Sequence, residues 1–298
     1  MAEVLVKAGS FVAIIIMGSL LKQKGFFKEE DFYILSKIVL KITLPAAIVS
    51  NFTGIDLKPS MLGLGGGLIL MTAGFLITVG KDGEERAFHI VNLPGYNIGN
   101  FSMPFAQSFL GPLGVVTTSL FDSGNAFICL GGSYSVALMA REKHTKFSFL
   151  PIIRTLLKSV PFDTYLLMTI LSLLHIGIPS PITSFAGIIA NANAFTAMLM
   201  IGVGFKLTGG GGRTGKIVKI LITRYSISIA LALIFYVFLP FELEIRQALI
   251  ILALSPMASA APAFTGTMGS DVGLSSAVNS ISVVISTVMI TVALMMIL

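Results

Sequence analysis

Two long apolar stretches of the chain each contain a proline beside small and polar residues, and these residues are the best candidates for chemistry. The first reads Asn97-Ile-Gly-Asn-Phe-Ser-Met-Pro104, the second reads Ser259-Ala-Ala-Pro262, and a glycine follows each proline after seven residues. A proline removes one helical hydrogen bond and frees the carbonyl four residues earlier. Within a bilayer, such freed groups persist only against protein, water or a ligand. A matched pair of interrupted stretches therefore indicates a transporter's binding site.

The residues around the two prolines are the predicted substrate contacts. Each proline suits the first position of a new half-helix, whose amino-terminal end carries roughly half a positive charge. Two such ends facing each other would attract an anion such as a carboxylate. The spans drawn below contain no interior Arg or Lys, so binding would depend on dipoles and amides. The predicted substrate-binding residues are Asn97, Gly99, Asn100, Ser102, Pro104, Ser259, Ala261 and Pro262. The alternative is that these polar groups only satisfy the freed backbone.

Asp122 is the candidate for coupling transport to an ion. It lies in Ser119-Leu-Phe-Asp122-Ser-Gly-Asn125, with apolar sequence on both sides. A carboxylate at membrane depth is costly, and it usually faces a cavity, forms a pair or carries protons. We therefore expect Asp122 to contribute to coupling, with Asn125 and Asn279 in support. The alternative is a structural carboxylate that is hydrogen-bonded to neighbouring helices.

The composition predicts an all-α integral membrane protein. Apolar residues make up 55% of the 298 and charged residues 11%, and the mean hydropathy is +0.92. Soluble domains carry about 25% charged residues, and the long apolar runs lack the alternation of barrel strands. The net charge of +6 reflects membrane topology, because its basic residues cluster beside the apolar runs, and no nucleic-acid partner is predicted.

No enzyme, metal site or cofactor is predicted. His89, His144 and His175 are scattered, without the spacing of metal ligands, and the chain has no His-Glu-x-x-His motif. No nucleophile has a base at a suggestive spacing.

Ten membrane spans are predicted, and the basic residues orient them. With the amino terminus outside, the loops after spans 1, 3, 5 and 7 and their flanks hold seventeen Lys and Arg residues, Arg224 included, and the other side holds three. Basic residues favour the cytoplasmic side. This predicts a multi-pass plasma-membrane protein with both termini outside and a cytoplasmic loop at 140–160. The spans lie near 4–22, 34–53, 61–80, 90–111, 114–139, 162–179, 183–205, 220–239, 247–269 and 273–297.

The chain divides into two halves of five spans each. The longest polar connection, 140–160, separates a first unit at 1–139 from a second at 161–298. Because each unit has an odd number of spans, the second enters the membrane from the opposite face, so a duplicated unit would be an inverted repeat.

These motifs resemble the auxin efflux carrier family, which includes bacterial malate-permease-like carriers. The resemblance extends as scattered positions over the chain, through Leu44-Pro45-Ala46, Asn97-Ile-Gly99-Asn100, Met103-Pro104, Ile201-Gly202-Val203-Gly204, Ala260-Ala-Pro262 to Asp271, and Ser275 to Ser286. It implies that broken spans 4 and 9 cross at their unwound prolines. It also implies a scaffold of spans 1, 2, 6 and 7, which can form a homodimer, and a transport domain of spans 3, 4, 5, 8, 9 and 10. The family's substrates are mainly organic anions.

The predicted function is therefore secondary active transport of small organic anions by alternating access. The related bile-acid sodium symporters are the nearest alternative. Their sodium sites need acidic and amide residues near span 9, where Leu254 to Ala263 offers only Ser255 and Ser259, so proton coupling is favoured over sodium coupling. A channel with the same polar centre and a receptor that binds without transport are the remaining alternatives.

Overall fold

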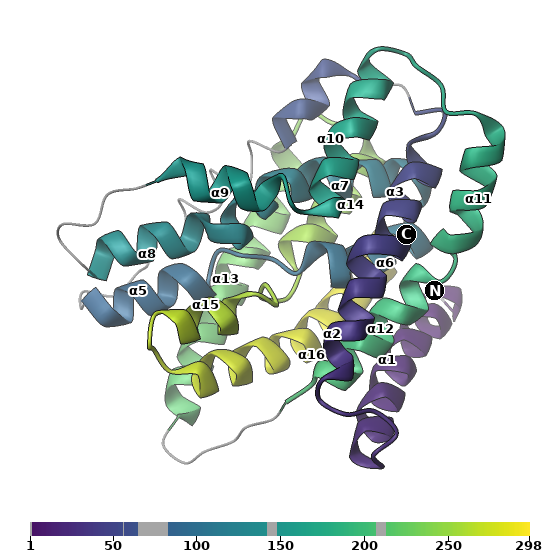
Figure 1. The fold of residues 1–298 in the computed structure, drawn as a ribbon. Helices are drawn as coiled ribbons and strands as arrows, with labels where there is room; N and C mark the ends of the chain where they lie inside the picture. Colours follow the sequence, from purple (N-terminus) through teal and green to yellow (C-terminus); the bar gives the residue numbers. More distant parts are fainter. Residues whose placement is uncertain (1, 56, 65–82, 142–147, 207–212) are drawn as a thin grey trace.

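The computed structural model describes residues 2–55, 57–64, 83–141, 148–206 and 213–298 (Figure 1). Within these ranges the chain forms helices and connecting segments, and its only strand-like pairing is one isolated bridge between Tyr96 and Met257. The predicted all-α class is confirmed. The predicted third span, 61–80, lies mostly outside the described residues; before it, Pro59–Leu62 forms the short helix η2.

Within the described ranges, six helices or joined helices are long and apolar enough to cross a membrane, so the protein is membrane-embedded. Three are single helices: α1 (Ala2–Gln23), α13 (Thr214–Phe238) and α16 (Val272–Ile297). The other three are joined helices: α2, η1 and α3 (Asp31–Ile38, Val39–Thr43, Leu44–Phe52); α7, η4 and α8 (Gly111–Phe127, Ile128–Gly132, Ser133–Arg141); and α11 and α12 (Ser180–Ala190, Asn193–Gly204).

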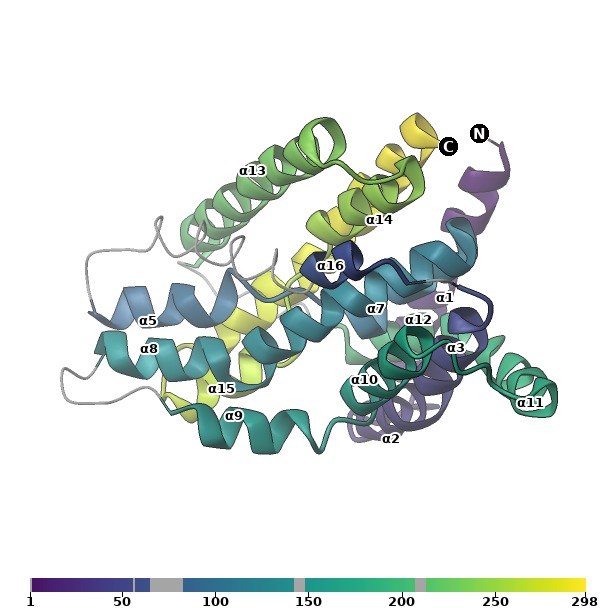
Figure 2. The ribbon, with the colours of Figure 1, turned by 90° about the horizontal axis from the view of Figure 1, so that it is seen from above.

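Shorter helices pack among these spans. They are α5 (Gly83–Asn92), η3 (Ile98–Ser102), α6 (Met103–Phe109), α14 (Leu243–Ala253) and α15 (Ala261–Thr267). Helix α5 lies beside α8, and α13 lies beside α14, as Figure 2 shows from above. Helix α16 crosses between these pairs and contacts α13, α14 and α15.

Prolines set where several of these helices begin. A proline occupies one of the first two positions in α3, α6, α7, α11 and α15, and also in α10 (Val160–Leu173). The amide hydrogen that a proline lacks would have no partner in the first helical turn, so proline is tolerated there. Asp271 caps α16, because its carboxylate accepts a hydrogen bond from the Leu274 amide at 2.9 Å.

The connection between the two halves contains a helix that the sequence does not predict. Within 140–160, α9 (Phe149–Leu156) precedes α10 (Val160–Leu173), and the two are bent by 80°. Ile152 and Leu156 of α9 are buried, whereas Phe149 and Ile153 are exposed. The basic residues Arg154 and Lys158 led to the prediction of a polar loop here, although the apolar residues of this stretch recur at helical spacing.

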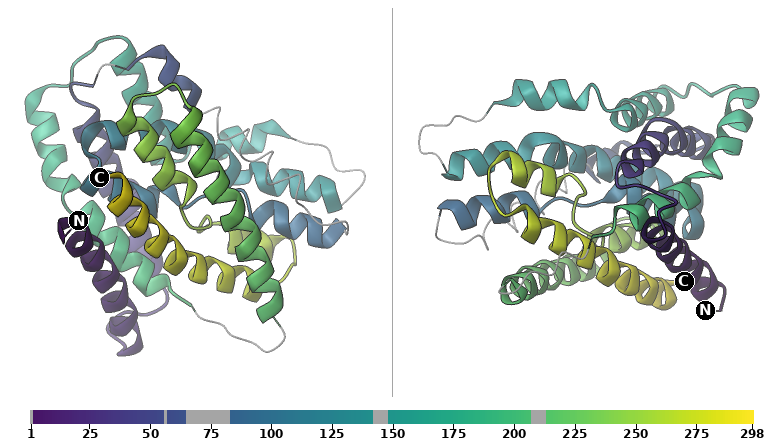
Figure 3. Two further views of the ribbon diagram at one scale, coloured as in Figure 1. Left: turned by 180° about the vertical axis from the view of Figure 1, so that it is seen from behind. Right: turned by 60° about the horizontal axis from the view of Figure 1, so that its bottom comes forward.

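Helices α1 and α12 lie side by side (Figure 3), and glycines lie at their contact. A Cβ atom added at Gly202 would lie 2.1 Å from the Ile15 carbonyl oxygen, and one added at Gly18 would lie 2.6 Å from the Leu199 carbonyl oxygen. Small residues let membrane helices approach this closely. The contact is therefore backbone against backbone.

We expect Gly202→Ala to destabilise the protein, because the new methyl group would meet a backbone oxygen that no rotamer change can move. Overpacking of this kind costs about 1–3 kcal/mol. Gly9→Ala on α1 is the matched control, since nothing lies within 4 Å of a Cβ atom there. Thermal unfolding in detergent, followed by circular dichroism, should show a lower Tm for Gly202→Ala alone. An equal Tm for both variants would contradict the close contact.

Candidate functional site

Two non-helical segments, residues 93–97 and 254–260, pair in the interior of the protein. The first follows α5 and the second follows α14. The Asn97 amide donates to the Pro256 carbonyl at 2.9 Å, and the Ala258 amide donates to the Gly95 carbonyl at 3.1 Å. Buried backbone groups need such partners. The two segments therefore satisfy part of each other's backbone.

An asparagine from the next long helix holds each segment. Asn125 of α7 accepts from the Tyr96 amide at 3.0 Å and donates to the Tyr96 carbonyl at 2.8 Å. Asn279 of α16 donates to the carbonyls of Met257 and Ala258, at 3.2 and 3.0 Å. The two predicted supporting residues thus act on the backbone of the paired segments.

The interruption in the first segment lies earlier than the sequence predicts. Pro104 is at the start of α6, but η3 continues directly into α6, so the chain is already helical from Ile98. The π-turn of η3 accommodates Pro104, and the non-helical residues instead contain Pro94. Pro262 is the second residue of the short helix α15, which begins at Ala261, one position before the predicted first residue.

Arg224 is a buried cation that the sequence analysis placed outside the membrane interior. It is 0% exposed, and α13 begins at Thr214, six residues before the predicted span. Arg224 therefore lies about 15 Å from the start of the helix, at 1.5 Å per residue. Its guanidinium donates to the carbonyls of Leu93 and Ser255. The prediction that no interior Arg or Lys exists was wrong, because the start of the span was placed too late.

Asp122 is buried and accepts two hydrogen bonds from side chains. Its Oδ1 accepts from Asn125 and its Oδ2 accepts from the Tyr165 hydroxyl, both at 2.8 Å. Tyr165 belongs to α10, and its contribution was missed because it lies forty-three residues away in the chain. A Cβ atom at position 99 would lie 3.0 Å from Leu44 Cδ2 and in ordinary contact, at 3.5 Å, with Asp122 Oδ2. These two hydrogen bonds are consistent both with a structural role of Asp122 and with a role in coupling transport to an ion.

Two cavities flank the paired segments and share Asn97 and Ser259. One, which we name the Lys206 cavity, has a volume of about 170 Å³, and its lining includes Asn97, Ser259, Pro262, Asn279, Glu29 and Lys206. The other, the Asp122 cavity, has a volume of about 200 Å³, and its lining includes Tyr96, Asn97, Gly99, Asn100, Asp122, Asn125, Tyr165 and Ser259.

Eight of the eleven predicted site residues therefore line these cavities, and three do not. Ser102, Pro104 and Ala261 are buried but line neither cavity. The Ser102 hydroxyl forms a hydrogen bond with the Ser255 hydroxyl. Asn100 has an unused acceptor, because its buried Oδ1 has no hydrogen-bond partner within the described part of the chain. A buried acceptor of this kind is costly to leave unpaired.

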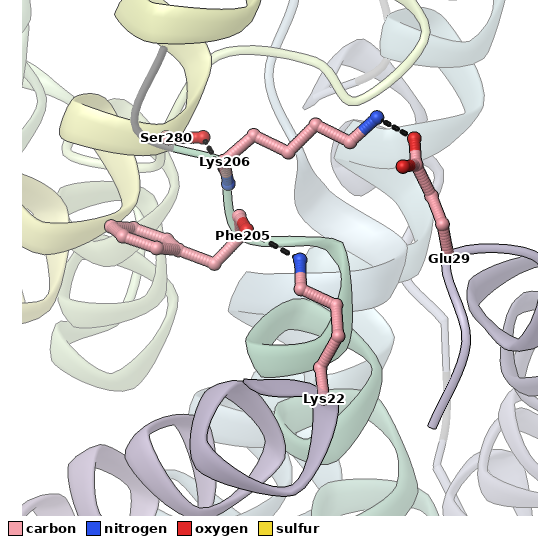
Figure 4. A network of polar contacts seen from close by, with 5 residues as sticks. All are labelled: Lys22, Glu29, Phe205, Lys206 and Ser280. Atoms are coloured by element: carbon pink, nitrogen blue, oxygen red, sulfur yellow. Dashed lines mark hydrogen bonds and ion pairs between the residues drawn. The ribbon is translucent and has the colours of Figure 1, made fainter. Parts of the chain in front are cut away.

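Basic side chains gather beside the Lys206 cavity (Figure 4). Lys22 Nζ donates to the Phe205 carbonyl at 2.7 Å, and the Lys206 amide donates to Ser280 Oγ at 3.2 Å. The Lys206 ammonium forms an ion pair with Glu29. The hydrogen bond from Lys206, together with its charge, holds the pKa of Glu29 below its usual value.

These features define a helical membrane protein with a polar interior site. No family model matches the chain, and no curated protein matches it in sequence. The functional argument therefore rests on the residues and their geometry.

We expect Asn125→Ala to destabilise the protein, because it leaves the Tyr96 amide and carbonyl and one Asp122 oxygen without this partner. Unsatisfied buried groups cost about 1–3 kcal/mol each. Ser123→Ala is the matched control on the same helix, since the Ser123 hydroxyl donates only to the Leu120 carbonyl among the bonds described. Thermal unfolding should show a markedly lower Tm for Asn125→Ala. If both variants melt like the native protein, Asn125 does not stabilise the segment 93–97.

Proposed function

We propose that the protein is a secondary active transporter of small organic anions that works by alternating access. The observation that carries this proposal is the pair of buried non-helical segments whose residues Asn97 and Ser259 line both cavities. Irregular backbone is tolerated at membrane depth where it is packed in protein or lines a cavity. Such backbone is the usual binding element of transporters with interrupted helices.

We further propose that α5 with η3 and α6, and α14 with α15, are two broken spans in an arrangement of ten spans and two inverted repeats. Helices α6 and α15 have seven residues each, and each is followed by a glycine with positive φ, Gly111 at 63° and Gly269 at 71°. Glycine adopts this conformation without strain. The matching roles of Asn125 and Asn279 support the same duplication.

The resemblance to the auxin efflux carrier family extends this proposal. Spans 1, 2, 6 and 7 would form the scaffold, with a homodimer through it, and spans 3, 4, 5, 8, 9 and 10 the transport domain.

The two termini lie near each other (Figure 3), which agrees with an even number of spans. Without Arg224, sixteen basic residues remain in the proposed cytoplasmic flanks against three on the other side. The plasma-membrane topology with outside termini is therefore retained as part of the proposal.

The size and polarity of the cavities support a small anion as substrate. An apolar cavity of about 150 Å³ holds a benzene molecule, and the two cavities here measure about 170 and 200 Å³. A steroid-sized bile acid is therefore disfavoured. Beside one cavity, the two ammonium groups of Lys22 and Lys206 accompany a single carboxylate, that of Glu29, which leaves one positive charge there. In the other cavity, Asn100 offers an acceptor to a hydroxyl or a protonated carboxyl group.

Asp122 is the proposed proton-coupling residue. It belongs to α7, in the proposed transport domain, whereas its partner Tyr165 belongs to α10, in the proposed scaffold. A hydrogen bond to an ionised carboxylate is stronger than one to a neutral acid. Protonation would therefore weaken a bond between the two domains.

We expect purified protein in liposomes to move at least one small carboxylate in a saturable manner. The probes are radiolabelled butyrate, malate and benzoate, measured with and without proton and sodium gradients. Counterflow, in which unlabelled substrate inside accelerates labelled uptake, identifies a carrier. Flux without saturation or counterflow would indicate a channel, and binding without flux would indicate a receptor. Acceleration by sodium alone would favour the sodium-symporter alternative.

We expect Asp122→Asn to abolish the response of carboxylate flux to a proton gradient, because an amide cannot take up the proton. Counterflow at equal pH on both sides should persist, since exchange needs no net proton movement. Asp163→Asn on α10 is the control, because Asp163 is exposed. Full gradient-driven uptake by Asp122→Asn would leave Asp122 with only its structural role.

A further inference from the structure

An aromatic contact joins α6, in the proposed transport domain, to α1, in the proposed scaffold. The Phe11 ring of α1 lies edge-to-face with the rings of Phe105 and Phe109 in α6, and the ring centres are 4.9 and 6.2 Å apart. This is a favourable arrangement of aromatic rings. Because Phe105 is 0% exposed and Phe11 only 7% exposed, the contact excludes water.

An amide side chain joins α6 to two further helices of the proposed scaffold. Gln107 of α6 donates to the Ala190 carbonyl at the end of α11, at 3.1 Å, and accepts from Asn193 of α12 at 3.4 Å. Asn193 is 0% exposed and also accepts from the Thr43 hydroxyl at 2.9 Å. The last carbonyls of a helix lack partners within it. Gln107 therefore connects α6 to the interruption between α11 and α12.

These contacts lie far from the charged end of the same scaffold helices. Lys22, near the end of α1, donates to the Phe205 carbonyl directly after α12, so the two helices end at the same level. Phe11 lies eleven residues before Lys22, and Asn193 lies eleven residues before Gly204. Each separation corresponds to about 16 Å of helix, at 1.5 Å per residue. The aromatic and amide contacts therefore share one level, distant from Lys22.

At the Lys22 end, a cavity lies between the same two domains. The lining of the Lys206 cavity includes Val203 of α12 on one side and Ser276 of α16 on the other. This cavity extends from the exposed residue Lys206 to Asn97 and Ser259 of the paired segments. The two domains are thus packed together at the Phe11 level and separated by a cavity at the Lys206 level.

We propose that Phe11 and Gln107 form a gate that closes the route from the outer side to the paired segments, so that the structure describes a state open toward the cytoplasm. This inference rests on the proposed function, in which α6 moves against the scaffold. Movement of one domain against the other opens one end of the site as it closes the other. The contacts of Phe11 and Gln107 therefore separate in every transport cycle, whereas contacts inside one domain persist.

The first test locks the aromatic contact. Phe11→Cys and Phe105→Cys are combined in a Cys129→Ala background, which removes the single native cysteine, and Hg²⁺ is added to bridge the two thiolates. The matched control is Tyr134→Cys with Phe264→Cys, because these rings stack at 5.3 Å and both belong to the proposed transport domain. Loss of free thiols verifies each bridge.

Flux of labelled butyrate, malate and benzoate into liposomes is measured before bridging, after bridging and after dithiothreitol. We expect the bridge between positions 11 and 105 to lower flux at least tenfold and dithiothreitol to restore it. The bridge within the transport domain should change flux less than twofold. Undiminished flux through the protein bridged between α1 and α6 would overturn the gate, since that contact would then not need to separate.

The second test measures which side reaches the site, and it keeps the aromatic contact intact. Ala106→Cys on α6, at a residue 1% exposed, reports on the outer route, and Ser276→Cys reports on the Lys206 cavity. A membrane-impermeant thiol reagent is applied to intact cells and to inside-out vesicles. We expect Ser276→Cys to react only in inside-out vesicles, and Ala106→Cys to react slowly on both sides.

Removing the amide contact should open the outer route. We expect Gln107→Ala to accelerate labelling of Ala106→Cys from outside at least tenfold. Gln247→Ala is the control, because Gln247 also donates to a carbonyl of another helix, that of Ile297, but both helices belong to the proposed transport domain. Equal labelling with and without Gln107→Ala would overturn the role of Gln107. Labelling of Ser276→Cys from outside alone would overturn the assigned state.

The two tests separate failure of the gate from failure of the proposed function. If the native protein moves none of the three carboxylates, the proposed substrates fail, whereas thiol labelling still tests the gate. If Phe11→Cys with Phe105→Cys does not fold, the Ala106→Cys reporter decides: faster outside labelling with Gln107→Ala supports the gate, and unchanged labelling overturns it.

Discussion

The interior of this protein depends on one constraint, which is that backbone amides and carbonyls away from water need partners. Where α5 and α14 end, the chain gives up helical hydrogen bonds, and two segments from distant parts of the sequence satisfy each other instead. Asn97 and Ala258 supply the amides of this exchange, and Gly95 and Pro256 supply the carbonyls.

Three side chains form further hydrogen bonds to the backbone of the two segments. Asn125 of α7 and Asn279 of α16 each bond to one segment from the next long helix, and Arg224 bonds to both segments from a third helix, α13. Because each support comes from a different helix, a shift of any one helix would change the geometry of the paired segments. The backbone of these segments is therefore sensitive to the arrangement of the surrounding helices.

The sequence predicted the helical membrane class, because composition is a strong signal. Eight of the predicted site residues line the two cavities, and their role in binding or coupling remains a prediction. The first interruption was predicted at Pro104, but it lies earlier, around Pro94. A π-turn accommodates Pro104 within the helix, and no local sequence pattern indicates such a turn. Arg224 was missed because span ends are the least certain part of a hydropathy reading. Tyr165 could not be found, since its contact with Asp122 depends on tertiary packing. The inverted repeat and the crossing as a transport element remain predictions.

The contact between Gly18 and Gly202 has a consequence for how this chain can evolve. In most packed interfaces, a larger residue on one side can be compensated by a smaller one on the other. Here both positions already carry the smallest residue, and the atoms that an added methyl group would meet are backbone atoms. Relatives that keep this helix contact should therefore show two invariant glycines at these positions, with no correlated exchange between them.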